Sequence, residues 1–176
     1  MHNTAFIALG SNLPYEDAEG PALLARAVSA LQSAGLRLRA QSGVWRTAAW
    51  PSSDQPDYYN AVVAVDPGPL SPQALYDVLR AVEERFGRVR REAWSPRTLD
   101  LDIVAIDGVA GTLGGITLPH ERMHERTFVL APLAEIAPNW RHPTLGKSVA
   151  ELLAGLGQTE GYRRIADLAG RLDREV

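Results

Sequence analysis

The sequence has no cysteine among its 176 residues. This absence excludes disulfide frameworks, thiolate nucleophiles and cysteine-based zinc or iron–sulfur centres. Carboxylates, imidazoles and backbone oxygens are the metal ligands that remain. A hard cation that prefers oxygen is therefore the metal that fits this composition best.

Long hydrophobic runs are also missing. No uninterrupted apolar stretch approaches the roughly 18 residues that a membrane-spanning helix needs. The N-terminal segment before Gly10 has too short an apolar run for a signal peptide, and it lacks the basic flank and the cleavage pattern of one. We therefore expect a cytoplasmic protein without a membrane partner.

An excess of one charge is missing as well, since 21 acidic and 18 basic residues leave a net charge of −3. No overall field attracts nucleic acid, so we expect no nucleic-acid partner and look for charge that acts locally. The 45% apolar content is enough for the core of one compact domain. We predict a monomer with one domain over residues 1–160 and a charged C-terminal tail over residues 161–176.

Apolar periodicity predicts an α+β protein. Its elements are expected in the order strand 5–9, helix 20–34, strand 36–46, strand 58–66, helix 71–86 and strand 99–106. This order is that of a ferredoxin-like fold, in which helices pack on one face of an antiparallel sheet. Helical patterns near residues 127–137 and 148–156 predict a C-terminal helical appendage.

Two carboxylates, Asp100 and Asp102, lie on the last of these strands. Strand alternation puts Leu99, Leu101 and Ile103 on one face and both acids on the other, about two residue rises apart. The two carboxylates repel each other unless a cation lies between them, and Mg²⁺ that bridges to phosphate oxygens supplies this charge. The alternative is an exposed strand face with ordinary solvated acids, because Asp-x-Asp needs further context to indicate a metal site.

An arginine-rich segment leads into this strand and contains Arg85, Arg88, Arg90, Arg91 and Arg97. The planar fork of arginine spreads positive charge over phosphate oxygens, so its place next to the acid pair favours phosphoryl transfer. The alternative is a solvated loop whose arginines pair with nearby glutamates. Trp94 lies within the segment and is interpreted as part of a lid over the substrate, with a local packing anchor as the alternative.

Four blocks of the sequence carry a resemblance to a known family. They are residues 7–13 (IALGSNL), residues 54–61 (DQPDYYNA), residues 87–102, in which GRVR precedes PRTLDLD, and residues 119–133, which begin with Pro119-His120. With these blocks in this order, the chain resembles the 6-hydroxymethyl-7,8-dihydropterin pyrophosphokinases of folate biosynthesis. The resemblance implies a modified ferredoxin-like fold, ATP as co-substrate, a reduced pterin as acceptor and two Mg²⁺ ions. It also implies that the terminal pyrophosphoryl group of ATP passes to the pterin hydroxymethyl oxygen, with release of AMP.

The resemblance further implies roles for the charged residues at matching positions. Asp100 and Asp102 would hold both metals, and together with Arg88 and Arg97 they make up the predicted catalytic set. The predicted nucleotide-binding residues are Arg88, Arg90, Arg97, His120 and Arg126. Taken alone, His120 would more often be an ordinary surface or capped histidine.

For the pterin, the matching positions are Tyr58 and Phe128, which would stack on the ring, and Thr47 and Asn60, which would bond to its edge. Trp94 completes this predicted substrate-binding set. A flat heteroaromatic ring needs apolar faces and a few fixed polar groups, as these residues provide. The plain alternative for the two stacking residues is core packing, the commoner fate of an aromatic side chain.

The chain departs from the family pattern in two places. Ala93 stands before Trp94, where many relatives have arginine, and Ser95 stands after it in place of glycine. Residues 48–51 differ from the proline-containing pterin loop of the family. We expect the first departure to affect closure of the arginine-rich loop and the second to affect the role of Thr47.

Two other classes of function are weighed against this one. Nucleotidyltransferases also combine a Gly-Ser turn with an acid pair, but there the pair follows the turn closely, whereas here about ninety residues and a whole βαβ segment lie between them. A ferredoxin-like module that binds RNA or senses a small molecule would need no catalytic site. The predicted strands lack the aromatic RNA-binding signature, and the net charge is negative.

Overall fold

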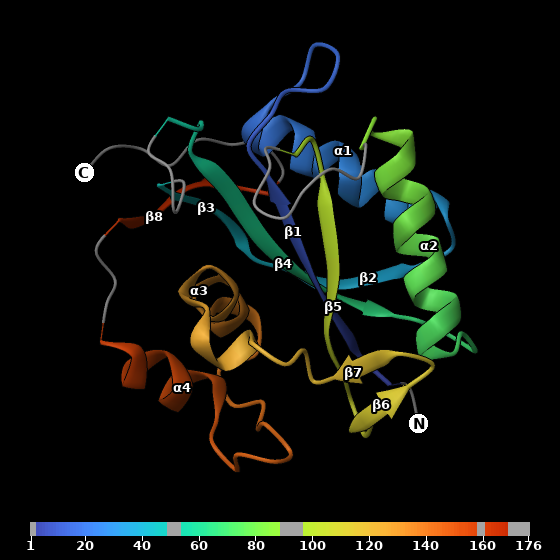
Figure 1. The fold of residues 1–176 in the computed structure, drawn as a ribbon, viewed down its shortest axis with the longest axis vertical. Helices are drawn as coiled ribbons and strands as arrows, with labels where there is room; N and C mark the ends of the chain where they lie inside the picture. The colour runs from blue at the N-terminus through green and yellow to red at the C-terminus, as the bar shows by residue number, and fades with distance from the viewer. Residues whose placement is uncertain (1–2, 49–53, 89–96, 158–160, 169–176) are drawn as a thin grey trace.

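The computed structural model describes residues 3–48, 54–88, 97–157 and 161–168. The strands of its main sheet are β1 (Ala5–Ser11), β2 (Arg37–Gln41), β3 (Gly43–Thr47), β4 (Tyr58–Asp66), β5 (Asp100–Ile106) and β8 (Tyr162–Asp167) (Figure 1). The helices are α1 (Gly20–Ser33), α2 (Pro72–Arg85), α3 (Thr127–Ile136) and α4 (Val149–Leu156). A hairpin of β6 (Gly111–Leu113) and β7 (Ile116–Leu118), which the sequence did not predict, lies apart from the main sheet. The predicted α+β class and ferredoxin-like element order are confirmed.

The main sheet has the strand order β5-β1-β4-β3-β8, and β2 also pairs with β4. Every pairing among these strands is antiparallel. β2 and β3 lie end to end along β4, so the single strand predicted over residues 36–46 is one extended segment that is interrupted at Ser42. There the Ser42 N–H donates to the Val62 carbonyl, and the Val62 N–H donates to Ser42 Oγ, both at 2.9 Å.

The helices begin and end where local chemistry allows it. α2 begins after Ser71, whose hydroxyl accepts the Ala74 N–H at 3.1 Å, and Pro72 occupies its first turn. Gly87, with φ of +69°, follows its C-terminus in the left-handed conformation that commonly ends a helix. Among the described residues, no helix has the length and apolar character that crossing a membrane requires.

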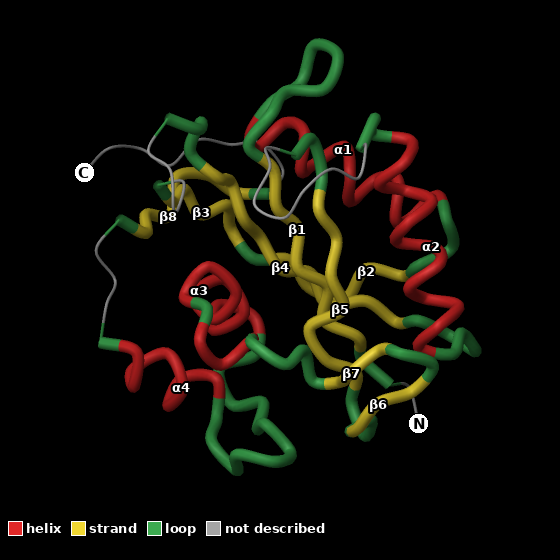
Figure 2. The backbone as a smooth tube through the Cα atoms, viewed as in Figure 1, coloured by secondary structure: helices red, strands yellow, loops and turns green. Residues whose placement is uncertain are grey.

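Helices cover both faces of the sheet (Figure 2). The two early helices pack on one face, as predicted for the ferredoxin-like unit, and the C-terminal helices cover the other. α1 and α2 pack against the face that carries Leu9, Val63 and Leu101. α3 and α4 pack against the face that carries Val62 and Val104. The predicted C-terminal helices therefore form the second layer of the fold, because central strands with apolar residues on both sides need a cover on each.

The C-terminal segment also differs from its prediction as a charged tail from residue 161. Residues 162–167 form β8, which pairs with β3 from Gly43 opposite Asp167 to Thr47 opposite Tyr162. Ala166 and Leu168 are buried in the core of the α1–α2 face, with 0% and 2% of their surface exposed. The charged residues Arg163, Arg164 and Asp167 hide the apolar pattern of this strand in the sequence.

Candidate functional site

The candidate site lies on the α3 side of the sheet, where β4, β1 and β5 run side by side. Gly10 of β1 lies opposite Asp100 of β5 and opposite Asn60 of β4. Directly opposed residues of antiparallel strands project to the same face, so a carboxylate and an amide flank a position without a side chain. Two residues further along each strand, Asp102 lies opposite Ala8 and projects to the same face. Small residues of β1 thus form a floor beside the two carboxylates.

Gly10 keeps this floor open. A Cβ atom at this position would lie 3.1 Å from Asn60 Oδ1 and 4.0 Å from Asp100 Cβ. A cavity of about 320 Å³ lies above the glycine, and it shares Gly10, Asn60 and both carboxylates with a smaller recess of about 40 Å³. The arrangement leaves room for a molecule that reaches from the carboxylates toward β3.

Most of the predicted site residues line these two spaces. The charged residues at the larger cavity include Arg97, Asp100, Asp102 and Arg126. The larger cavity is also lined by four residues that were predicted to bind the pterin, namely Thr47, Tyr58, Asn60 and Phe128. His120 lines the smaller recess, and Arg88 contacts Asp100. The predicted residues Arg90 and Trp94 lie outside the described residues.

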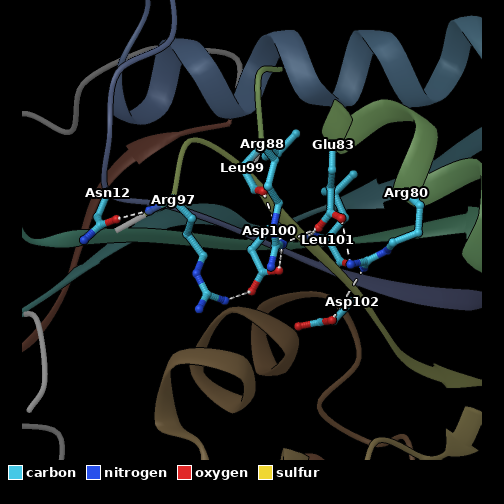
Figure 3. A network of polar contacts seen from close by, with 9 residues as sticks. All are labelled: Asn12, Arg80, Glu83, Arg88, Arg97, Leu99, Asp100, Leu101 and Asp102. Carbon is cyan, nitrogen blue, oxygen red and sulfur yellow. Dashed lines mark hydrogen bonds and ion pairs between the residues drawn. The ribbon is translucent and has the colours of Figure 1, made fainter. Parts of the chain in front are cut away.

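Asp100 is held by two guanidinium groups (Figure 3). Arg88 donates a hydrogen bond to its Oδ1, and Arg97 donates to its Oδ2 at 2.9 Å. Burial opposes ionisation of Asp100, but the two arginines outweigh burial and hold its pKa below the usual value. Arg97 is itself anchored to the loop after β1, since its N–H donates to Asn12 Oδ1 at 2.9 Å and its carbonyl accepts the Asn12 N–H at 3.1 Å. Asp100 is therefore an ionised, tightly positioned carboxylate.

Asp102 is the more open of the two carboxylates, with 41% of its side chain exposed against 22% for Asp100. A guanidinium nitrogen of Arg80 lies 3.9 Å from its Oδ1. The position of Asp102 in the cavity floor raises its pKa by burial, and the charge of Asp100 raises it further. A divalent cation beside both carboxylates would offset this repulsion. The oxygen ligands and the charge of the pair therefore fit a hard metal ion.

A buried acid on α2 fixes the strand that carries these carboxylates. Glu83 is only 2% exposed, and it accepts the Leu101 N–H at 2.8 Å and a guanidinium N–H of Arg88 at 2.6 Å. It also pairs with Arg80 at 2.7 Å, and Arg80 donates to the Leu101 carbonyl. Burial raises the pKa of Glu83 to about 7, although the Leu101 N–H and the two arginines restrain the rise. Helix α2 is thus bound to β5 at the residue between Asp100 and Asp102.

The sequence prediction missed Arg80 and Glu83 as parts of the site. It treated α2 as an amphipathic helix and Glu83 as a possible partner of loop arginines. One signal was present, because Glu83 lies four residues after Leu79 and next to Val82 on the apolar stripe of the helix. An acid on a buried stripe needs specific partners, and here the strand backbone and two arginines provide them.

His120 and Arg126 approach the carboxylates from the segment between β7 and α3. The His120 N–H donates to the Val104 carbonyl at 2.7 Å, which fixes the segment to β5. Burial lowers the pKa of His120, and the charge of Asp102 opposes this shift. Nδ1 of His120 accepts the Arg122 N–H at 3.2 Å, so Nε2 carries the proton of the neutral ring. His120 thus borders the carboxylates as a neutral donor, while Arg97 on the β5 side and Arg126 on the α3 side bring positive charge to the cavity.

The end of the cavity toward β3 is less charged. Thr47 lies opposite Tyr58, and the Asn60 side-chain amide lies 3.5 Å from Thr47 Oγ1. Phe128, in the first turn of α3, lies beneath the Arg126 guanidinium, whose central carbon is 5.5 Å from the ring centroid. Burial raises the pKa of Tyr58, as expected for a phenol with an apolar environment. This end offers two aromatic rings and two fixed polar groups.

Comparisons of the sequence with known proteins agree with these features. The family model for 7,8-dihydro-6-hydroxymethylpterin-pyrophosphokinase (HPPK) matches residues 6–138. A 2-amino-4-hydroxy-6-hydroxymethyldihydropteridine pyrophosphokinase from Methylorubrum extorquens is 40% identical over 162 residues, which cover 92% of this chain and 98% of the relative. The enzyme of the same name from Pseudomonas aeruginosa is 39% identical over 94% of this chain and 98% of its own length.

Solved structures share the fold. Wild-type HPPK-DHPS from Plasmodium falciparum matches 97% of this chain with a TM-score of 0.73 and 13% identity. The same protein with pterin and p-hydroxybenzoate matches with a TM-score of 0.72 and 14% identity. This chain spans about half the length of those proteins, 50% and 48% respectively, and at such identity the likeness shows the fold alone. On the match of the family model and the similarity to curated relatives over nearly their full length, the chain belongs to the 7,8-dihydro-6-hydroxymethylpterin-pyrophosphokinase family.

Proposed function

We propose that this chain transfers the pyrophosphoryl group of ATP to the hydroxymethyl oxygen of 6-hydroxymethyl-7,8-dihydropterin in folate biosynthesis, and that the cavity above β1, β4 and β5 is where it does so. The family supplies the activity. The location is supported by one observation, which is that two different environments lie in the same cavity. Carboxylates and arginines border one end, and aromatic rings with fixed polar groups border the other.

The metal would lie at Asp100 and Asp102, and we propose two Mg²⁺ ions. Among the described residues, no group of three or more histidine or acidic side chains could hold a metal by itself. Mg²⁺ commonly binds through one or two carboxylates and takes its other ligands from water and substrate phosphates, so an acid pair is sufficient. When bound, Mg²⁺ neutralises charge on the phosphate oxygens during transfer.

The arginines of the site would bind the triphosphate. Arg88 and Arg97 already point their guanidinium groups at one carboxylate, and the same fork binds phosphate oxygens in two parallel hydrogen bonds. Arg126 and the Nε2 proton of His120 would hold the triphosphate from the α3 side. Arg90, outside the described residues, would act with the arginine-rich loop. No side chain stands out as the acceptor of the hydroxyl proton, and positioning with charge stabilisation carries the proposed step.

The pterin ring would occupy the end of the cavity toward β3. Tyr58 and Phe128 would contact its faces, while Thr47 and Asn60 would bond to its edge, because an amide offers a donor and an acceptor together. Trp94, outside the described residues, would close over the bound ring. The hydroxymethyl group then faces the carboxylates, where the β-phosphorus of ATP is held.

Product analysis tests this function. With ATP, Mg²⁺ and 6-hydroxymethyl-7,8-dihydropterin, the purified protein should form AMP and the pterin diphosphate in equal amounts. AMP arises because the bond between the α and β phosphates breaks. Formation of ADP would reject pyrophosphoryl transfer, and release of free pyrophosphate with AMP would indicate hydrolysis instead.

A further inference from the structure

Tyr162 is a cavity residue that no part of the predicted site includes. It lies on β8 opposite Thr47 of β3, and it lines the same cavity as Thr47, Tyr58 and Asn60. Directly opposed residues of antiparallel strands have Cβ atoms about 4.5–5.5 Å apart and share a face. The Tyr162 ring therefore stands next to a residue proposed to bind the pterin edge. It also lies beyond residues 6–138, the range matched by the family model.

One carboxylate holds the strand of Tyr162 in place. Glu135 of α3 accepts the Gly43 N–H at 3.1 Å and the Trp45 indole N–H at 2.5 Å, both from β3. It also accepts the Arg164 Nε–H from β8 at 3.2 Å. Three elements that border the cavity are thus joined at a single side chain.

Gly43 makes this junction possible. A Cβ atom at Gly43 would lie 2.4 Å from the guanidinium carbon of Arg164, so a larger residue here would displace the Arg164 side chain from its present path to Glu135. Arg164 also pairs with Asp167 at 2.9 Å on its own strand. The strand of Tyr162 is consequently fixed relative to α3, the helix that carries Phe128.

The position of Tyr162 determines which part of a ligand it meets. The carboxylates lie on β5, whereas Thr47 lies on β3 and Tyr162 on β8, three and four strands away in the order β5-β1-β4-β3-β8. Because the reacting hydroxymethyl group must face the phosphates, the opposite end of the pterin ring faces β3 and β8. We propose that Tyr162 is a substrate-positioning residue whose aromatic ring closes the acceptor end of the cavity against the distal edge of the pterin. This inference rests on the proposed function for the orientation of the ring.

The test compares ligand affinities of single variants without turnover. Calorimetric titration would use 6-hydroxymethyl-7,8-dihydropterin with Mg²⁺ and an ATP analogue in which a methylene group replaces the oxygen between the α and β phosphates. Tyr162→Ala should weaken pterin binding roughly tenfold, as truncation of a packed aromatic contact does. Its affinity for the ATP analogue and its melting temperature should stay at the wild-type values. Tyr162→Phe should bind pterin like the wild type, because it keeps the ring.

Arg163→Ala is the matched control, since Arg163 is the next residue of β8 and projects to the opposite face. It should leave pterin affinity unchanged. Unchanged pterin affinity in Tyr162→Ala would overturn the inference, as would an equal loss of pterin and nucleotide affinity with a lowered melting temperature. If the wild type forms no AMP but Tyr162→Ala still loses pterin affinity, the proposed reaction fails and the role of Tyr162 stands.

Discussion

On the α1–α2 side of the sheet, Leu9, Ala61 and Leu101 are buried beneath two helices. On the α3 side, the residues next to them in sequence, Gly10, Asn60 and Asp100, border a cavity. Both sets come from the same three strands and differ only in which face they project to. The contrast shows that neighbouring residues of one strand can have different tasks. Those on one face stabilise the protein, and those on the other face are placed to bind ligands.

The sharpest test of this separation is Asp102→Ala. We expect metal-dependent turnover to fall by about a hundredfold or more, as happens when a preorganised charged group at the reacting centre is removed. The free energy of unfolding should change little, because 41% of the Asp102 side chain is exposed and its ion pair with Arg80 is long, at 3.9 Å. Steady-state kinetics over a range of Mg²⁺ concentrations, with a thermal melt of each variant, measures both effects. Unchanged turnover would remove Asp102 from the metal site.

The neighbouring substitution Leu101→Ala should have the opposite profile. Leu101 is completely buried on the α1–α2 face, so truncation should lower the free energy of unfolding by about 2–5 kcal/mol. Urea denaturation monitored by tryptophan fluorescence gives this value. At temperatures where the variant stays folded, its kcat should remain near that of the wild type. A loss of turnover as large as that of Asp102→Ala would show that the two faces are not separable.

A smaller effect is expected at Gly10, where the cavity depends on a residue that has no side chain. In Gly10→Ala the new Cβ would lie 3.1 Å from Asn60 Oδ1 and push the amide aside. We expect the KM for pterin to rise roughly fivefold, which corresponds to the loss of about one hydrogen bond, with little change in the KM for ATP. Gly155→Ala is the matched control, because a Cβ there meets nothing within 4 Å. A wild-type KM in Gly10→Ala would show that Asn60 tolerates the displacement.

The smallest effect concerns the second helical layer away from the cavity. His142 is buried in the segment that joins α3 to α4, and its Nδ1 accepts the Thr144 and Leu145 N–H groups at 3.3 and 3.2 Å. Burial, with the nearby His124, lowers its pKa below 6.5. The folded protein therefore favours the neutral His142 ring. The stability that the neutral ring contributes is fully present above pH 6.5 and is lost as the pH falls through the lowered pKa.

The comparison of the wild type with His142→Asn isolates this contribution, because the asparagine oxygen can accept the same N–H groups but does not titrate. The difference in melting temperature between the two proteins should shift in favour of the variant as the pH falls from 7 to 5. A constant difference over this range would show that His142 has no part in the pH dependence. Activity measured at pH 7 should be the same in both proteins.

Periodicity in the sequence was sufficient to predict the four strand segments, the two early helices and the carboxylate pair. Alternation along β5 put Asp100 and Asp102 on one face, which the pairing of β5 with β1 confirms. It could not show how helices divide between two faces, since every central strand is apolar on both sides. The contacts of Glu83 with Leu101 and Arg88 were also out of reach, because they join residues that only the folded chain brings together.

The charged composition of residues 162–167 has a further meaning now that they form a strand. A strand at the margin of a sheet exposes unpaired N–H and C=O groups that can recruit another chain, and charged side chains are a common protection against this. β8 carries Arg163, Arg164 and Asp167 at that margin, and it covers the edge of β3. The charged residues that led to the prediction of a tail are therefore the same residues that protect the edge of this strand. A chain ended at residue 160 would leave Val44 and Trp45 on an open edge, and self-association would be its expected defect.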